Sequence, residues 1–190
     1  AFAWMTRLGS TLGDATLAAN VVLWQFFEIS AYALDGFAMA AETLVGQAAG
    51  ARSRARLRRA AVATSLWSGL LALGLSALFL AAAGPVIDLF TNVEEVRALA
   101  RVYAPWAAMV PAVGFAAFQL DGIFVGATAS REMRDAMILA AAAYFPAAWL
   151  MTQALGNHGV WAGVHLFLAL RAATLLRLYP RIEARAAAPA

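Results

Sequence analysis

The apolar positions of the chain fall into long runs separated by short breaks that are polar or rich in glycine. The breaks divide the chain into six apolar segments, at about residues 1–12, 16–49, 57–83, 93–128, 134–155 and 160–178. The segments are rich in alanine and leucine and lack the alternation of period two that marks a strand, so they predict helices. The first is too short to cross a bilayer, which takes about 20 apolar residues, and we expect it to be truncated.

The segments differ in how they are expected to end and bend. As a helix, segment 16–49 would be about 50 Å long against a hydrocarbon core of about 30 Å, so it must tilt, bend or project. Gly84 and Pro85 predict the end of the third segment, and a polar cytoplasmic tail is expected over 181–190, after Pro180. Prolines inside the fourth and fifth segments predict kinks that neighbouring helices make tolerable. They are Pro105, Pro111 and Pro146.

The composition indicates where these helices reside. The chain has 190 residues, of which 63% are hydrophobic and 13% charged, and its mean hydropathy is +0.72. Soluble domains are nearer to half apolar and a quarter charged, since they must present a polar surface to water. We therefore predict an all-α polytopic membrane bundle with the lipid bilayer as a partner; the alternative is a very hydrophobic soluble bundle. The absence of cysteine excludes disulfides, thiolate metal sites and a cysteine nucleophile.

The distribution of positive charge predicts the orientation of the bundle. All 14 basic residues are arginine, and they gather in the links after the second, fourth and sixth segments, whereas the links between these hold none. Because cytoplasmic loops carry an excess of positive charge, the alternation predicts six spans with a cytoplasmic C-terminus. It also disfavours nucleic acid as a partner, since the charge is not spread over a soluble face. The grouped arginines are Arg52, Arg54, Arg56, Arg58, Arg59, Arg131, Arg134, Arg177, Arg181 and Arg185.

The second segment carries a stripe of acidic residues, Glu28, Asp35 and Glu42, each seven positions from the next. Seven residues are nearly two helical turns, so all three share one face, which Gln25 and Tyr32 also occupy. A carboxylate at mid-span, as expected for Asp35, costs about 2.5–3.5 kcal/mol on insertion scales and normally faces a bundle interior or an aqueous cavity. We expect the stripe to line a cation or substrate cavity, with Glu42 the weaker candidate near the cytoplasmic end. Alternatively, these acids form interhelical hydrogen bonds or pair with an arginine.

Further candidates lie in the later segments. Gln119 and Asp121 belong to the fourth segment, where the triplet Leu-Asp-Gly at 120–122 repeats the one at 34–36. Asp121 is either a second cavity carboxylate or a helix-packing acid. His165, inside the sixth segment, is a weaker candidate, because a lone intramembrane histidine is more often a hydrogen-bonding contact than a proton relay.

The sequence contains no recognisable catalytic arrangement. Paired histidines for a metal, a phosphate-binding loop and a nucleophile elbow are all absent, so we predict no enzyme, no catalytic residue, no metal and no cofactor other than a coupling ion. The glycine-rich stretch Gly46–Ala51 lacks the lysine of a phosphate loop and predicts close helix packing before a sharp turn. A membrane-embedded enzyme would need a cluster of His, Asp and Glu at one membrane face.

Five stretches carry a resemblance to a known family. They are Leu17–Asn20, Ala33–Ala38, Val45–Ala51, Leu120–Thr128 and Arg131–Arg134. In this order and spacing they resemble the second half of multidrug and toxic compound extrusion (MATE) transporters, most of all the DinF-like branch. The resemblance implies twelve helices in two lobes, of which residues 1–180 would be the C-terminal lobe.

The same resemblance implies a function and its partners. It implies antiport across the inner (plasma) membrane, in which H⁺ or Na⁺ enters while a small organic substrate, often a cation, leaves. It makes the missing N-terminal lobe a partner and places a coupling acid in that lobe's first helix, while some members use acids of the C-terminal lobe. The alternatives are a lipid-linked saccharide flippase, which would need a more cationic cavity, and a membrane scaffold that transports nothing.

Overall fold

The computed structural model describes residues 2–186, which form six α-helices and no strand. In chain order the helices are α1 (Phe2–Ser10), α2 (Asp14–Gly50), α3 (Arg54–Phe90), α4 (Glu94–Gly126), α5 (Ser130–Leu155) and α6 (Asn157–Arg185). All except α1 are long and apolar enough to cross a membrane. The predicted all-α fold is thus confirmed.

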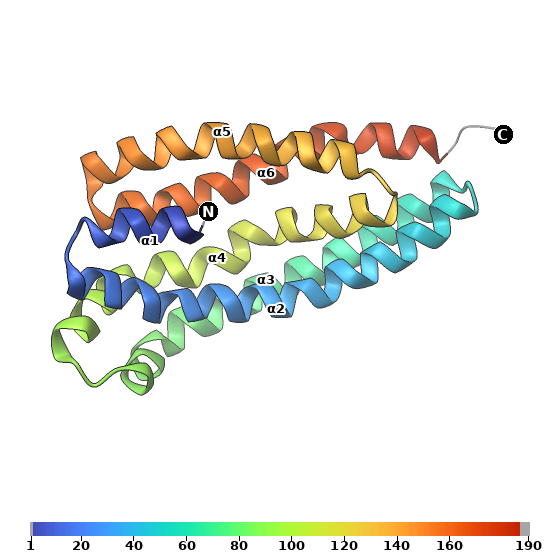
Figure 1. The fold of residues 1–190 in the computed structure, drawn as a ribbon. Helices are drawn as coiled ribbons and strands as arrows, with labels where there is room; N and C mark the ends of the chain where they lie inside the picture. The colour runs from blue at the N-terminus through green and yellow to red at the C-terminus, as the bar shows by residue number, and fades with distance from the viewer. Residues whose placement is uncertain (1, 187–190) are drawn as a thin grey trace.

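Helix α4 lies at the centre of the bundle. It packs against α2, α3 and α6, while α5 packs mainly on α6 and the short α1 lies against α2, α5 and α6. In Figure 1, α5 and α6 form one side of the molecule, α2 and α3 form the other, and α4 runs between them. A side chain on α4 can therefore face α2, α3 or α6, depending on its rotation about the helix axis.

Helices α2 and α4 approach each other through glycines. A methyl group on Gly122 would overlap the backbone of Ala38, and one on Gly126 would overlap the backbone of Glu42, while Gly46 faces Gly126. Small residues four positions apart allow such close packing of membrane helices. The close packing expected around Gly46 is present, and its partner is the Gly122–Gly126 pair.

Two helices extend past the ends that the sequence predicted. Helix α3 continues through Gly84 and Pro85 to Phe90, and α6 continues through Pro180 to Arg185. In α3 the added turn buries Ile87 completely. In α6 the added turn carries Glu183, which forms an ion pair with Arg54 of α3. Tertiary contacts of these last turns therefore outweigh the helix-breaking tendency of the prolines, and the predicted tail begins as helix.

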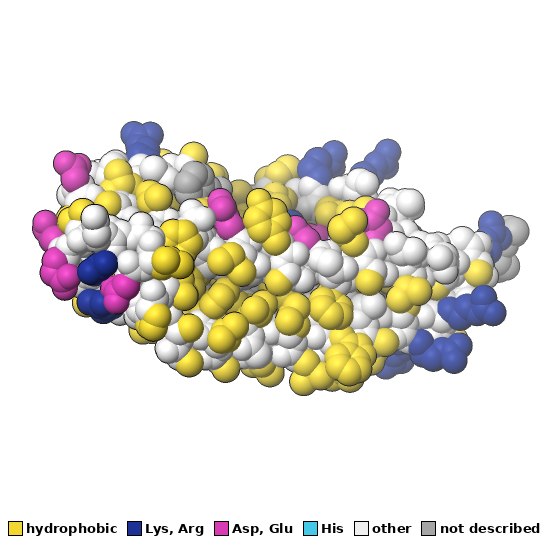
Figure 2. Space-filling model, turned by 90° about the horizontal axis from the view of Figure 1, so that it is seen from below, with side chains coloured by type: hydrophobic (Ala, Val, Ile, Leu, Met, Phe, Trp, Pro, Cys, Tyr) yellow, Lys and Arg dark blue, Asp and Glu magenta, His cyan; other side chains and the backbone are white. Residues whose placement is uncertain are grey.

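The two ends of the bundle differ in charge. The α2–α3 and α4–α5 links and the end of α6 lie together (Figure 1), and Figure 2 shows arginines without acidic side chains at that end of the visible face. At the opposite end, Arg97 and Arg101, which lie just beyond the α3–α4 link, both pair with Asp88, at 3.4 and 2.5 Å. Unpaired positive charge is therefore concentrated at one end.

Candidate cation and substrate site

The acidic stripe of α2 lies on the face of the helix that is turned away from the bundle core. Glu28, Asp35 and Glu42 are all exposed, and the Tyr32 side chain between the first two is 77% exposed. In Figure 2, acidic side chains are spaced along the middle of the molecule. None of the three carboxylates forms an ion pair with a residue in the described range 2–186. The predicted common face is therefore present, and its carboxylates are available to a ligand.

A further carboxylate, that of Asp121 on α4, forms an ion pair with an arginine of α6. The Nη2 group of Arg171 donates to Oδ2 of Asp121, and both side chains are about one-fifth exposed, at 20% and 19%. Asp35 of α2 lies at the same contact of α2 with α4, one helical turn before the Ala38 backbone that meets Gly122. We call Asp35, Asp121 and Arg171 the acid–arginine cluster.

The cluster forms where α2 and α4 touch. Asp121 immediately precedes Gly122, whose contact is the backbone of Ala38, and Ala38 lies one helical turn after Asp35. The glycine contact thus brings the two Leu-Asp-Gly triplets to the same level of the bundle. With both acids ionised, the cluster holds two negative charges and one positive charge. Arg171 compensates the charge of Asp121, whereas Asp35 forms no ion pair with a residue of the described range.

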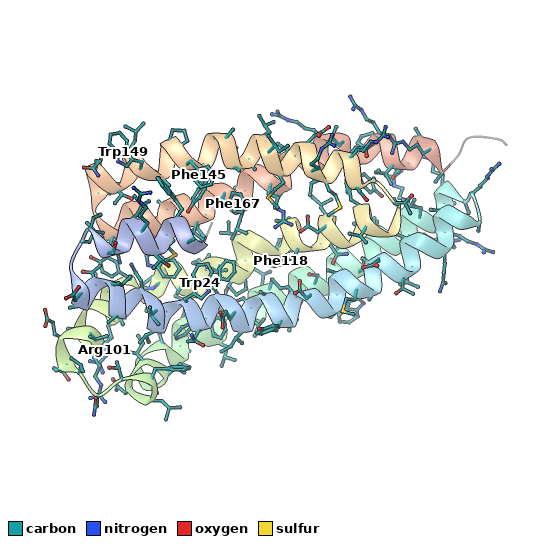
Figure 3. All side chains as sticks on the ribbon, viewed as in Figure 1. Trp24, Arg101, Phe118, Phe145, Trp149 and Phe167 are labelled. Atoms are coloured by element: carbon teal, nitrogen blue, oxygen red, sulfur yellow. The ribbon has the colours of Figure 1, made fainter. Side chains whose placement is uncertain are left out.

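Aromatic side chains lie in the inner part of the bundle. Trp24, Phe118 and Phe167 lie toward the space between α2, α4 and α6 (Figure 3). Phe27 stacks on Trp24 at 4.3 Å between ring centroids and lies 6.5 Å from Phe118. Phe167 lies 5.2 Å from Tyr144 of α5. Trp24, Phe27, Phe118 and Phe167 all pack, partly buried, against the hydrophobic core of the bundle.

Comparison with known proteins decides the family. The MatE family model matches residues 1–150 of the chain. The chain belongs to the MatE family. It is 41% identical over 180 residues to "DNA damage-inducible protein F" of Escherichia coli (strain K12), covering 95% of this chain and 39% of that protein. It is 25% identical over 167 residues to "Protein DETOXIFICATION 43" of Arabidopsis thaliana, covering 88% of this chain and 32% of that protein.

The fold of this MatE chain matches a solved structure. Superposition on the eukaryotic MATE transporter AtDTX14 gives a TM-score of 0.82 at 17% sequence identity, covering 90% of this chain and 40% of that one. The likeness confirms the MATE fold, and with the apolar helices it makes the chain a multi-pass membrane protein. The chain spans about two fifths or less of the length of these relatives.

Three predicted candidates not yet placed in this MatE chain, Gln119, His165 and Gln25, also lie outside the acid–arginine cluster. Gln119 is buried at 2% exposure, and its Nε2 donates to Oγ1 of Thr64 on α3 at 2.6 Å, so it forms an interhelical contact between α4 and α3. His165 is half-buried on α6, and its ring stacks on Trp106 of α4 at 5.4 Å. Gln25 is half-buried on the acidic face of α2.

Arg171 is the residue of the cluster that the sequence analysis missed. It lies within the apolar segment 160–178, where a buried charge costs as much as a carboxylate does. An arginine so placed requires an acidic partner, and Asp121 lies in another apolar segment. Matching these two isolated charges would have been the signal to find the pair.

A buried polar network that the sequence did not reveal sets the rotation of α2. Asn20 and Asn157 exchange side-chain hydrogen bonds of 2.6 and 2.9 Å, and the Nε1 of Trp161 donates to Oδ1 of Asn20 at 2.9 Å. All three residues are buried. The network joins α2 to the start of α6, and this fixes which face of α2 carries the exposed acids.

Proposed function

We propose that this chain is the C-terminal lobe of a MATE antiporter, which exports organic cations across the inner membrane in exchange for H⁺ or Na⁺. One observation carries the proposal: Arg171 compensates Asp121, while the carboxylate of Asp35, which shares an exposed face of α2 with Glu28 and Glu42, has no counter-ion among the described residues. Intramembrane carboxylates that can gain and lose a cation are what an ion-coupled transporter needs.

The mechanism is competition for the carboxylate of Asp35. When the carboxylate is ionised, it attracts an organic cation, whose apolar groups contact the aromatic side chains around Trp24 and Phe118. A proton or Na⁺ from outside neutralises the carboxylate and so weakens its hold on the substrate. Each ligand can shift the equilibrium between inward-open and outward-open states only by its difference in affinity for the two. The second lobe would complete the pathway.

The charge difference between the ends supports an orientation. Cytoplasmic loops carry the excess of arginine in multi-pass membrane proteins. The arginine-rich end holds Arg52 to Arg59 and the last turns of α6, whereas the arginines at the other end are paired with Asp88. In this proposal the C-terminus is cytoplasmic and the α3–α4 link faces the outside.

The flippase alternative is less well supported. A lipid-linked pyrophosphate needs free positive charge in the cavity. The guanidinium group of the cluster, that of Arg171, already binds Asp121, and the exposed charged groups on α2 are acidic.

The test is efflux by the full-length transporter in proteoliposomes with an imposed gradient of protons or of Na⁺. Asp35→Asn should lower gradient-driven export of a fluorescent organic cation by about tenfold or more, a barrier difference of about 1.4 kcal/mol. Glu95→Gln is the matched control, because Glu95 is exposed at the end of the bundle and forms no ion pair with a described residue. Unchanged export by a correctly inserted Asp35→Asn variant would refute the role of Asp35.

A further inference from the structure

A groove of about 750 Å³ lies at the arginine-rich end, between α3, α4 and α6. Its apolar part is built from side chains of all three helices. They include Val62 and Leu66 of α3, Phe115 and Ile123 of α4, and Leu176 of α6. Helix α2 contributes no lining residue, so the groove is separate from the acidic stripe.

Positive charge is in excess at one end of the groove. The Nη2 and Nε atoms of Arg54 lie 2.9 and 3.1 Å from Oε2 of Glu183, and Nε of Arg58 lies 3.9 Å from Oε1 of the same residue. Two guanidinium groups thus share one carboxylate. The Arg58 side chain is 69% exposed and Glu183 only 9%, so Arg58 can bind a further anion while Glu183 stays in place.

The groove changes from charged to apolar along α3. Arg58 and Leu66 are eight residues apart, which corresponds to a rise of about 12 Å. Val62, Leu66 and Leu176 are each at least 60% exposed, so the apolar part opens on the surface of a membrane helix. A ligand that fills the groove must carry negative charge at one end and hydrocarbon at the other.

We infer that this groove binds an anionic phospholipid of the surrounding membrane. Its phosphate contacts Arg58 and Arg54, and one acyl chain lies along Val62, Leu66 and Phe115. Charge-assisted hydrogen bonds from guanidinium to phosphate fix the headgroup, and basic pockets between membrane helices on the cytoplasmic side recognise such headgroups. A soluble anion would leave the apolar wall unused, and an organic cation would be repelled by the two arginines.

The test counts phosphatidylglycerol bound to the purified full-length transporter by native mass spectrometry, with phosphatidylcholine as the neutral reference. Arg58→Gln should weaken phosphatidylglycerol binding about fivefold, the usual contribution of one basic residue near a lipid surface. Arg56→Gln is the matched control: Arg56 is exposed on the same turn of α3 but does not line the groove. Equal losses in both variants would overturn the proposal in favour of diffuse attraction.

Two further variants test the groove itself. Ser65→Phe adds bulk to the lining without changing charge and should displace phosphatidylglycerol. Glu183→Gln frees both arginines and should tighten phosphatidylglycerol binding, with helical content by circular dichroism as the check on folding. Unchanged binding in a folded Ser65→Phe variant, or equal competition by inorganic phosphate, would show a free phosphate site rather than a lipid site. The assay involves no transport, so its outcome is independent of the proposed antiport.

Discussion

The two Leu-Asp-Gly turns of the chain, at 34–36 in α2 and 120–122 in α4, share a sequence but occupy different environments. In α2, Asp35 is exposed and a Cβ on Gly36 would meet open space, whereas in α4, Asp121 binds Arg171 and a Cβ on Gly122 would meet the backbone of α2. The turn in α2 leaves its carboxylate exposed, whereas the turn in α4 contacts α2 through Gly122 and α6 through Asp121. The surrounding helices, rather than the local sequence, decide the role of each acid.

The largest difference in stability between the two turns is expected when their glycines, Gly122 and Gly36, are replaced by alanine. Gly122→Ala forces α2 and α4 apart, because the new methyl group overlaps the backbone of Ala38 on a helix that cannot yield locally. We expect a loss of about 3 kcal/mol in the free energy of unfolding, typical of overpacking. Gly36→Ala should be neutral or slightly stabilising, since alanine favours helix. Titration of the full-length protein with SDS in mixed micelles measures both, and equal effects at the two sites would contradict the comparison.

Removing the counter-ion of Asp121 should have the next largest effect. Arg171→Gln leaves a mostly buried carboxylate unpaired and should cost about 2 kcal/mol of unfolding free energy. Adding Asp121→Asn to that variant should recover part of the loss, because a neutral amide needs no counter-ion. A double-mutant cycle in the same titration checks this, and strictly additive losses would mean that the ion pair does not stabilise the protein.

The smallest effect on the free energy of unfolding is expected for the exposed acid of α2. Asp35→Asn should change the free energy of unfolding by no more than about 0.5 kcal/mol, because exposed side chains without partners contribute little. The same variant is expected to lose gradient-driven export. If Asp35→Asn unfolded as readily as Arg171→Gln, then Asp35 would be a structural residue and the two turns would be equivalent.

Much of the fold could be predicted because membrane helices are encoded locally. The length of the apolar segments, their composition and the absence of the alternation typical of strands suffice to predict helices and their approximate limits. The continuation of α3 past Pro85 and of α6 past Pro180 could not be predicted, since it depends on the burial of Ile87 and on the ion pair between Glu183 and Arg54. Both contacts join residues far apart in the sequence.

For the candidate site, the sequence could predict which residues share a face of one helix, but not which residues of different helices meet. A period of seven places Glu28, Asp35 and Glu42 on one face whatever surrounds them. Gln119 lies two positions before Asp121, and residues two positions apart on a helix differ by about 200° in direction, so its side chain meets α3 while that of Asp121 meets α6. The pairing of Asp121 with Arg171 required the packing of α4 against α6.

The network of Asn20, Asn157 and Trp161 differs from the ion pairs of the bundle in how it responds to the surrounding medium. None of these side chains can gain or lose a proton near neutral pH, and hydrogen bonds between neutral groups are insensitive to ionic strength. The ion pairs at the arginine-rich end, by contrast, are partly exposed and weaken as salt rises. The contact between α2 and α6 therefore keeps its geometry on either side of a pH or salt gradient, whereas the exposed ion pairs, those of Asp88 as well as those at the arginine-rich end, weaken as the ionic strength of the medium rises.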